Sequence, residues 1–345
     1  MAADRDQSDD LSDDMARLIQ EVLTDLGTEA DAAEIARRVR GLDICLPAED
    51  EFGVICAWLG RCRLIHKLDQ QQAPVSSRDI YQVADLLAAF DAAGPFLIEV
   101  KAKQDRTLSF RPDYFGRLTA YAELLGLPLL IAWKFHSMWS LFDARHLRVA
   151  RINFNITQSE AMKQNLLGVL AGDVAYSLGS GAGIHFDCVK EELISVEDAG
   201  DHSTEEWRTR ISEAFFTDGA GRRRNDLHPE TQQLFASWDL QREEEVLADS
   251  IRLSFVPGEN QMQFAHGALV HLLAWERPAG VQQNWRHLLR APTITRSIGD
   301  FGQALDRALR ESVVHQILHL QPVDWPDFLP RSVDGRRSSD VVGTA

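Results

Sequence analysis

The sequence lacks long apolar runs and has few cysteines. Within its 345 residues, no apolar run approaches the ~20 residues needed to span a bilayer. The amino-terminal MAADRDQSDDLSDD does not have the pattern of a signal peptide. Cys45, Cys56, Cys62 and Cys188 form no CxxC pair, which is typical of reduced thiols. We therefore expect a soluble cytoplasmic protein without a membrane partner. A zinc site at Cys56, Cys62 and His66 is a disfavoured alternative.

Basic residues are scarcer than acidic ones. The 36 lysines and arginines stand against 52 aspartates and glutamates, for a formal net charge of −16. Tight, nonspecific wrapping of DNA is excluded, because it needs a basic footprint. Local basic clusters flank residues 85–101, with Arg61, Arg63 and Lys67 before this segment and Lys103, Arg106 and Arg111 after it. A basic lip on an acidic body is the expected charge distribution.

Two nucleotide- and metal-binding motifs are also missing. SLGSGAGIHF has spaced glycines, but no P-loop lysine follows, so a glycine-rich hairpin turn is expected. His315 and His319 fall four apart in ESVVHQILHL, which we predict to be a helix, and the glutamate of HExxH is absent. We expect these histidines to pack rather than to bind metal, and any ATP-driven step to need another chain.

The most informative segment is a predicted strand pair that carries two acids and a lysine. The strand VADLLAAF contains Asp85, and FLIEVKAK contains Glu99 and Lys101. Since strand side chains alternate, Glu99 and Lys101 share a face, and the DAAGP turn lets Asp85 approach them. Two carboxylates and an ammonium on one patch can hold a hard divalent cation and an activated water. This is the chemistry of phosphodiester hydrolysis.

The same residues resemble a known superfamily. An aspartate followed 14 positions later by Glu-x-Lys resembles the PD-(D/E)XK nucleases, which include restriction endonucleases and Holliday-junction resolvases. VADLLAAF takes the place of the Pro-Asp-hydrophobic segment, with Ala84 where proline is common, and LIEVKAK that of the Glu-x-Lys strand. RPDYFGRLTAYAELLGLPLLIAW resembles the helix and strand that follow, and AEDEFGVICAWLG the first helix of the fold. The resemblance covers residues 46–150.

The resemblance implies an α/β fold, a restriction-endonuclease-like mixed sheet flanked by helices, and a nuclease that uses Mg²⁺ or Mn²⁺. Asp85, Glu99 and the main-chain carbonyl of Val100 would hold the metal. Lys101 would position the water or stabilise developing charge, a role preferred to that of general base. Glu51 would be an additional ligand, or it only stabilises the start of its helix.

Four more side chains are candidates for substrate contact, with DNA as the favoured nucleic acid. Arg117 and Tyr121 lie in RLTAYA, which resembles the Gln-xxx-Tyr element of RecB-like members with Arg117 in place of glutamine. Arg117 can clamp a phosphate; alternatively it pairs with a nearby acid and Tyr121 is packed. Lys103 and Arg106 belong to the basic loop after the Glu-x-Lys strand.

Five regions are expected along the chain. An acidic disordered tail at 1–14 and a helical segment at 15–45 precede the nuclease-like domain at 46–150. A C-terminal α+β domain at 151–330, to which we assign a homo-oligomer or protein contact, is followed by a polar tail at 331–345. The helical segment is expected to cap the core; the alternative is a winged helix.

Two other interpretations of the whole chain stay open. One is an inactive nuclease-fold scaffold or sensor that binds nucleic acid or protein, which the acidic charge favours. The other is an ordinary α/β protein in which Glu99 and Lys101 form a surface ion pair. For an active nuclease, a role in restriction or phage defence would suit the appended domain.

Overall fold

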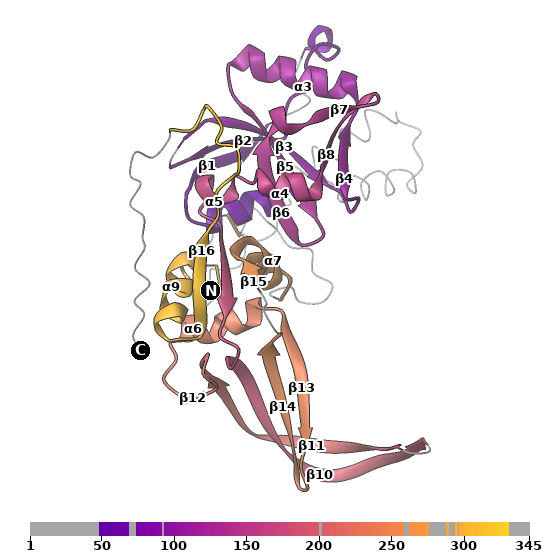
Figure 1. Ribbon diagram of the computed structural model, residues 1–345, viewed down its shortest axis with the longest axis vertical. Helices are drawn as coiled ribbons and strands as arrows, with labels where there is room; N and C mark the ends of the chain where they lie inside the picture. The colour runs from indigo at the N-terminus through magenta and orange to yellow at the C-terminus, as the bar shows by residue number, and fades with distance from the viewer. Residues whose placement is uncertain are drawn as a thin grey trace, which may run out of the picture.

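The computed structural model describes residues 48–68, 74–91, 93–199, 202–258, 262–275, 288–289, 294–295 and 297–330. The expected regions at 1–14, 15–45 and 331–345 therefore lie outside the described residues. The molecule is elongated, with a helix-covered sheet at one end and a long β-arm at the other (Figure 1). None of the described helices has both the length and the apolar character needed to cross a membrane.

The main sheet, sheet A, has five strands in the order β1-β2-β3-β5-β6. These are β1 (Cys62–Lys67), β2 (Leu86–Phe90), β3 (Phe96–Ala102), β5 (Leu129–Phe135) and β6 (Met138–Asp143). β3 and β5 run parallel, and the other neighbours are antiparallel. The predicted mixed sheet flanked by helices is confirmed.

Helix α3 (Pro112–Leu125) connects the two parallel strands. Pro112 begins its first turn, and Gly126 ends it with a left-handed φ of 64°, as expected for the two ends of a helix. This crossover places the start of α3 close to the end of β3, so that a helix side chain can reach the strand face that carries Glu99.

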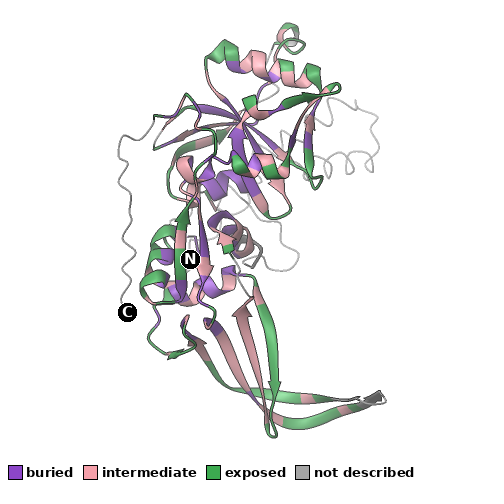
Figure 2. Cartoon of the chain, in the orientation of Figure 1, coloured by how far each residue is buried: buried purple, intermediate pink, exposed green. Residues whose placement is uncertain are grey.

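Apolar side chains cover both faces of sheet A. Leu97 and Ile131 lie in one buried cluster with Leu118 of α3. Ile98, on the opposite face, lies in a second cluster with Phe52 of the helical residues 48–58. The first five residues of β5, Leu129–Trp133, are therefore a continuous apolar run, as a strand buried on both faces requires, whereas β3 is apolar only up to Glu99. Figure 2 shows the buried residues concentrated here.

Two small sheets connect this part to the rest of the chain. Sheet B has the order β4 (Thr107–Phe110), β8 (Asn153–Thr157), β7 (Arg148–Ala150), and sheet C the order β15 (Met262–Phe264), β9 (Val174–Leu178), β16 (Val314–His319). The accompanying helices are α4 (Gln158–Lys163), α5 (Leu167–Leu170), α6 (Pro229–Leu234), α7 (Ala265–Trp275) and α9 (Phe301–Arg310). Sheet B crosses the expected boundary at residue 150, and one buried cluster runs from Phe52 to Tyr176 and Leu305.

The prediction of a helix at His315 and His319 is wrong. These residues belong to β16, which pairs antiparallel with β9 from Val314 to His319. The β-branched residues Val313, Val314 and Ile317 favour a strand, and β9 offers an edge for it. Four strand positions span about 13 Å, and both histidines are exposed, so they share no ligand.

Sheet D forms the arm, in the order β12-β11-β10-β14-β13. Its strands are β10 (Gly183–Ala199), β11 (His202–Thr217), β12 (Arg223–Arg224), β13 (Leu240–Val246) and β14 (Ser250–Pro257). β14 pairs with β10 only as far as Val189, so the rest of the β10–β11 hairpin projects as a two-stranded ribbon (Figure 1).

The glycine-rich segment before β10 joins sheet C to sheet D and is not the turn of a hairpin between β9 and β10, which lie in different sheets. A Cβ at Gly179 would lie 2.2 Å from the Cα of Gly219. Glycine is required because two backbones cross in contact at this point.

Candidate active site

Asp85 and Glu99 lie side by side where the pairing of β2 with β3 ends. The last registered pair is Leu86 with Ile98, and Asp85 Oδ2 accepts a hydrogen bond of 2.7 Å from the backbone N–H of Val100. The aspartate side chain thus takes the place of a strand partner. Since the N–H and C=O of a strand residue point to the same edge, the carbonyl of Val100 points towards Asp85 and away from β5.

Glu99 is completely buried, and its two oxygens have different surroundings. Oε1 accepts hydrogen bonds from Lys101 Nζ and from the Tyr114 hydroxyl. Oε2 is buried without a hydrogen-bond partner among the described residues. Burial and the charge of Asp85 raise the pKa of Glu99 to about 7, although Lys101 and Tyr114 act in the opposite direction. A buried oxygen without a donor is costly and is the kind of atom that a cation satisfies.

Lys101 lies beside two aromatic rings. Its Nζ lies 5.3 Å from the ring centre of Tyr114 and 5.9 Å from that of Phe110. Burial lowers the pKa of Lys101, but the charges of Glu99 and Asp85 outweigh this effect and raise it above its ordinary value. This raised pKa favours the ammonium form of Lys101, which is suited to positioning and charge stabilisation more than to proton abstraction.

Tyr114, at the start of α3, is a site residue that the sequence analysis missed. Burial and the charge of Glu99 raise the pKa of Tyr114, so its hydroxyl keeps the proton that it donates. The position of Tyr114 at the start of the helix that follows Glu-x-Lys could have indicated its role. Helix spacing alone could not, because it places Arg117 and Tyr121 on the same face as Tyr114.

The structure does not bring Glu51 to this group. Its Oε2 accepts from Lys134 Nζ at 2.7 Å, and its Oε1 accepts from Trp139 Nε1 at 3.0 Å. Glu49 is the helix acid whose charge interacts with that of Asp85: burial, and then the Asp85 charge, raise the pKa of Glu49 to about 7. Consecutive helix residues point about 100° apart, so only one of the neighbouring acids can face the strand end.

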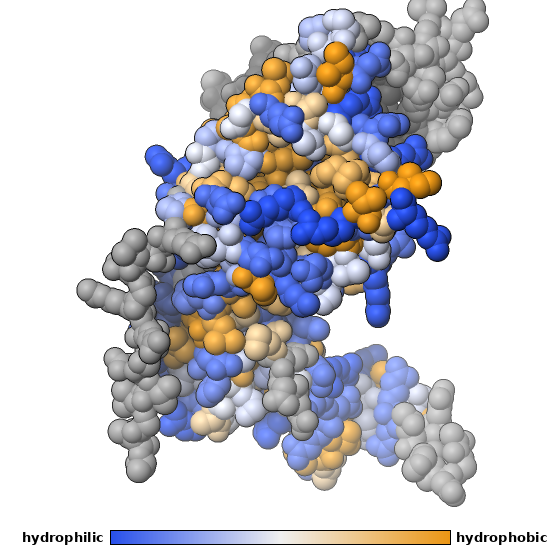
Figure 3. All heavy atoms as spheres, turned by 45° about the horizontal axis from the view of Figure 1, so that its top comes forward, coloured by the Kyte–Doolittle hydropathy of each residue, from blue (hydrophilic) through white to orange (hydrophobic). Residues whose placement is uncertain are grey.

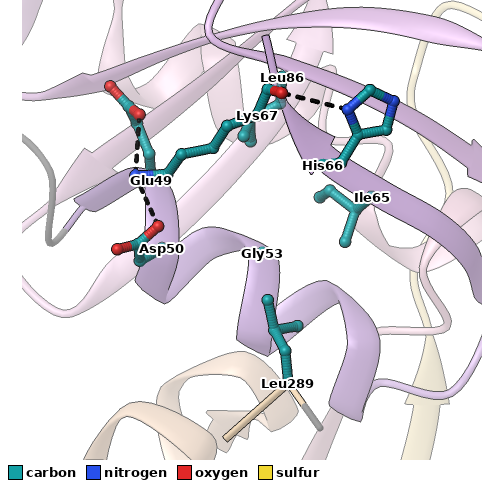
Figure 4. A pocket seen from close by; sticks show the side chains of 8 residues that line it. All are labelled: Glu49, Asp50, Gly53, Ile65, His66, Lys67, Leu86 and Leu289. Atoms are coloured by element: carbon teal, nitrogen blue, oxygen red, sulfur yellow. Dashed lines mark hydrogen bonds and ion pairs between the residues drawn. The ribbon is translucent and has the colours of Figure 1, made fainter. Parts of the chain in front are cut away.

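A cavity of about 330 Å³ opens beside Glu49 (Figure 4). Lys67 of β1 reaches over it, with Nζ 3.3 Å from Glu49 Oε2 and 2.6 Å from Asp50 Oδ1. The lining residues are Glu49, Asp50, Gly53, Ile65, His66, Lys67, Leu86 and Leu289. Of the acids discussed here, Glu49 and Asp50 line this cavity, whereas Asp85 and Glu99 do not and are buried.

The four predicted substrate residues lie around this group without touching it. Arg117 donates from Nη1 to the carbonyl of Arg78 at 3.1 Å, and its Nε is buried without a partner within the described part of the chain. Burial raises the pKa of the half-buried Tyr121. Lys103 and Arg106 are exposed in the β3–β4 loop. Arg117 is therefore neither a free phosphate clamp nor the partner of a nearby acid, which are the two alternatives that the sequence suggested.

The donor set fits a hard divalent cation. Within the described ranges, no three His, Cys, Asp or Glu side chains form a ready-made metal cluster, so neither a closed cage nor the alternative zinc site is present. Mg²⁺ commonly binds through one or two carboxylates and keeps several waters. Glu99 Oε2 and the Val100 carbonyl supply oxygens of that kind.

Comparison with known proteins adds little to this geometry. No protein-family model matches the chain, and no curated protein matches it. Among solved structures, the chain is similar to the 1.6 Å structure of Archaeoglobus fulgidus Hjc, a Holliday junction resolvase from an archaeal hyperthermophile. The match has 21% identity and a TM-score of 0.24, and it covers 28% of this chain and 74% of that chain. A likeness this partial gives no information about activity, so the candidate site is judged from its own residues.

Proposed function

We propose that the chain is a metal-dependent nuclease that hydrolyses phosphodiester bonds, with DNA as the favoured substrate. The observation that carries the proposal is Oε2 of Glu99: a buried oxygen without a donor, beside a second carboxylate, on a side chain whose other oxygen is held by Lys101 and Tyr114. A surface ion pair of an ordinary α/β protein would be exposed, whereas Glu99 is 0% exposed.

Glu99, Asp85 and the Val100 carbonyl would hold Mg²⁺ or Mn²⁺. The bound cation would lower the pKa of a water and neutralise charge on the phosphate. Glu49 faces the cavity beside the site, and with a pKa of about 7 it can accept a proton at neutral pH. Hydrogen-bond donors that are already held in position, such as the Lys101 ammonium, can stabilise the charge that develops in the transition state without first reorganising.

Two lysines supply positive charge around these acids. Lys101 keeps its proton and has further N–H groups for a phosphate oxygen or the attacking water. Lys67, paired with Glu49 and Asp50 at the cavity mouth, places a second ammonium where a substrate phosphate would enter.

Cleavage of labelled single- and double-stranded DNA and RNA by the full chain, with Mg²⁺, Mn²⁺ or EDTA, tests this proposal. We expect metal-dependent cleavage of DNA that Glu99→Gln and Lys101→Met each reduce by roughly 100-fold or more. Glu123→Gln, an exposed carboxylate on α3, is the matched control and should cleave like the wild type.

Three results would decide against an active enzyme at this site. Cleavage that persists in EDTA would contradict the requirement for a divalent metal. Full activity of both site variants would contradict the assignment of Glu99 and Lys101 to the site. Absence of cleavage on every substrate, with retained Mn²⁺ binding, would favour the inactive scaffold or sensor.

A further inference from the structure

Sheet D has one face made of ion pairs. Side chains directly opposite each other on neighbouring strands share a face, and the polar face carries Arg252 paired with Asp187 at 2.7 Å. Arg223 pairs with Glu213, and farther along the ribbon Arg208 pairs with Glu192 at 2.5 Å. The register also places Glu206, Glu243 and Glu245 on this face, so it is polar and carries more acids than bases.

The opposite face carries most of the apolar side chains of the arm. The register sets Phe186 against Ala214 and Leu253, and Leu193 against Trp207. We call this the apolar arm face; its projecting part is formed by Phe186, Leu193, Val196, Trp207, Ile211 and Val246.

Three irregularities in the β10–β11 register keep the apolar arm face continuous. They fall between Asp187 and Cys188, between Lys190 and Glu192, and between Leu193 and Ser195. A bulge inserts one residue into one strand. Without the bulges in β10, the alternation along its sequence would turn Leu193 and Val196 to different faces.

Little of this face is covered by the described chain. At its base, Ile184, Phe216 and Leu240 pack against the main buried cluster. Farther out, Val196 is 50% exposed and Ile211 58% exposed. Figure 2 shows the ribbon almost without buried residues, and Figure 3 shows apolar side chains among polar ones at this end of the molecule. An isolated two-stranded ribbon is marginally stable in water, and an exposed apolar face of this kind marks an interface.

The charges on the apolar arm face indicate which kind of partner this face can bind. Between Ile184 and Val196 the face carries Lys190 and Arg242 of one sign, and Glu205 and Glu244 of the other. Nucleic acid would need a basic face, and a strongly charged protein would need a face of opposite charge. A balanced apolar face is instead complementary to itself, which is the property of a two-fold contact between identical chains.

The size of the face indicates a small interface. From Phe186 to Val196 the ribbon runs about 30 Å at ~3.3 Å per residue, since two of the steps fall at bulges of β10, and with β14 beside its base it is roughly 10–15 Å wide. Covering it would bury about 300–450 Å² on each copy, which is the size of a weak contact that depends on concentration.

We propose that the chain forms a dimer in which the apolar arm face packs on the same face of a second copy. With the two-fold axis near the Leu193–Trp207 pair, antiparallel arms bring Lys190 of each copy to the level of Glu205 of the other. The dimer does not depend on the nuclease activity proposed above.

Size-exclusion chromatography with light scattering, on the full chain over a range of concentrations, tests the dimer. We expect a dimeric wild type, and an Ile211→Glu protein whose dimer dissociates at least tenfold more readily. Leu124→Glu, at a residue of α3 that is 60% exposed, makes the same kind of change away from the arm and should stay dimeric.

A wild type that is monomeric at every concentration would overturn the proposal, as would an Ile211→Glu dimer as stable as that of Leu124→Glu. Circular dichroism checks that the Ile211 variant is folded. If it is not, Val196→Glu near the tip of the ribbon decides by the same criterion. A monomer that copurifies with nucleic acid through the arm would equally overturn the proposal.

Discussion

At the scale of single residues, Lys101 and Tyr114 both donate to Oε1 of Glu99. These donors fix the orientation of the carboxylate and favour its charged form, while Oε2 stays without a donor. In the proposed metal site, Tyr114 would therefore be a positioning residue that acts through Glu99.

Replacing Tyr114 by phenylalanine should weaken metal binding. The change removes one donor but keeps the ring beside Lys101, and a hydrogen bond to a charged group contributes about 1.5–3 kcal/mol. We expect Mn²⁺ to bind roughly 10–100-fold more weakly in calorimetric titration at pH 7. Tyr176→Phe, whose hydroxyl contacts Gln263, is the control. Equal Mn²⁺ affinity in the Tyr114 variant and the wild type would contradict the positioning role.

The raised pKa of Glu99 makes the stability of the metal-free protein depend on pH. The carboxyl titrates near its ordinary value of 4.5 in the unfolded chain and at about 7 in the folded one. Between these values the folded state holds a proton that the unfolded state has lost. Raising the pH from 5 to 8 should therefore destabilise the fold through this group, by on the order of 1–3 kcal/mol.

Urea unfolding without metal at several pH values measures this effect. Glu99→Gln cannot titrate at this position, so the wild type should lose stability relative to the variant as the pH rises. Parallel stability curves for the two proteins would show that Glu99 does not have a raised pKa.

At the scale of secondary-structure elements, the strand pair, α3 and β5 were predictable because each carries a strong local signal. Alternating or continuous apolar residues mark the strands, and Pro112 and Gly126 mark the helix ends. These elements bring Asp85, Glu99 and Lys101 together, so the centre of the candidate site could also be predicted.

Other elements could not be predicted because tertiary contacts decide them. The helix at 48–58 has completely buried residues around much of its circumference, including Phe52, Val54 and Ile55, so periodicity does not reveal which acid interacts with the charge of Asp85. β16 depends on its pairing with β9. The bulges of β10 break the two-residue alternation that identifies a strand.

At the scale of the whole molecule, the described parts of 46–150 and 151–330 share one buried cluster. The run of arginines at 222–224 is paired with nearby acids at the base of sheet D: Arg222 with Asp218, Arg223 with Glu213 and Arg224 with Asp226. It therefore stabilises the base of the arm and leaves no free cations for phosphate. Lys103 and Arg106, by contrast, are exposed in the loop that follows β3.

The proposed nuclease site depends most on a divalent cation at Glu99. Crystals of the full chain grown with Mn²⁺ and measured for anomalous scattering locate such an ion directly. We expect an anomalous peak about 2–2.3 Å from Glu99 Oε2, shared with Asp85 and the Val100 carbonyl, with waters completing the coordination of the ion. No peak there at saturating Mn²⁺, with Oε2 instead hydrogen-bonded to a protein donor or a water, would contradict the proposed metal site.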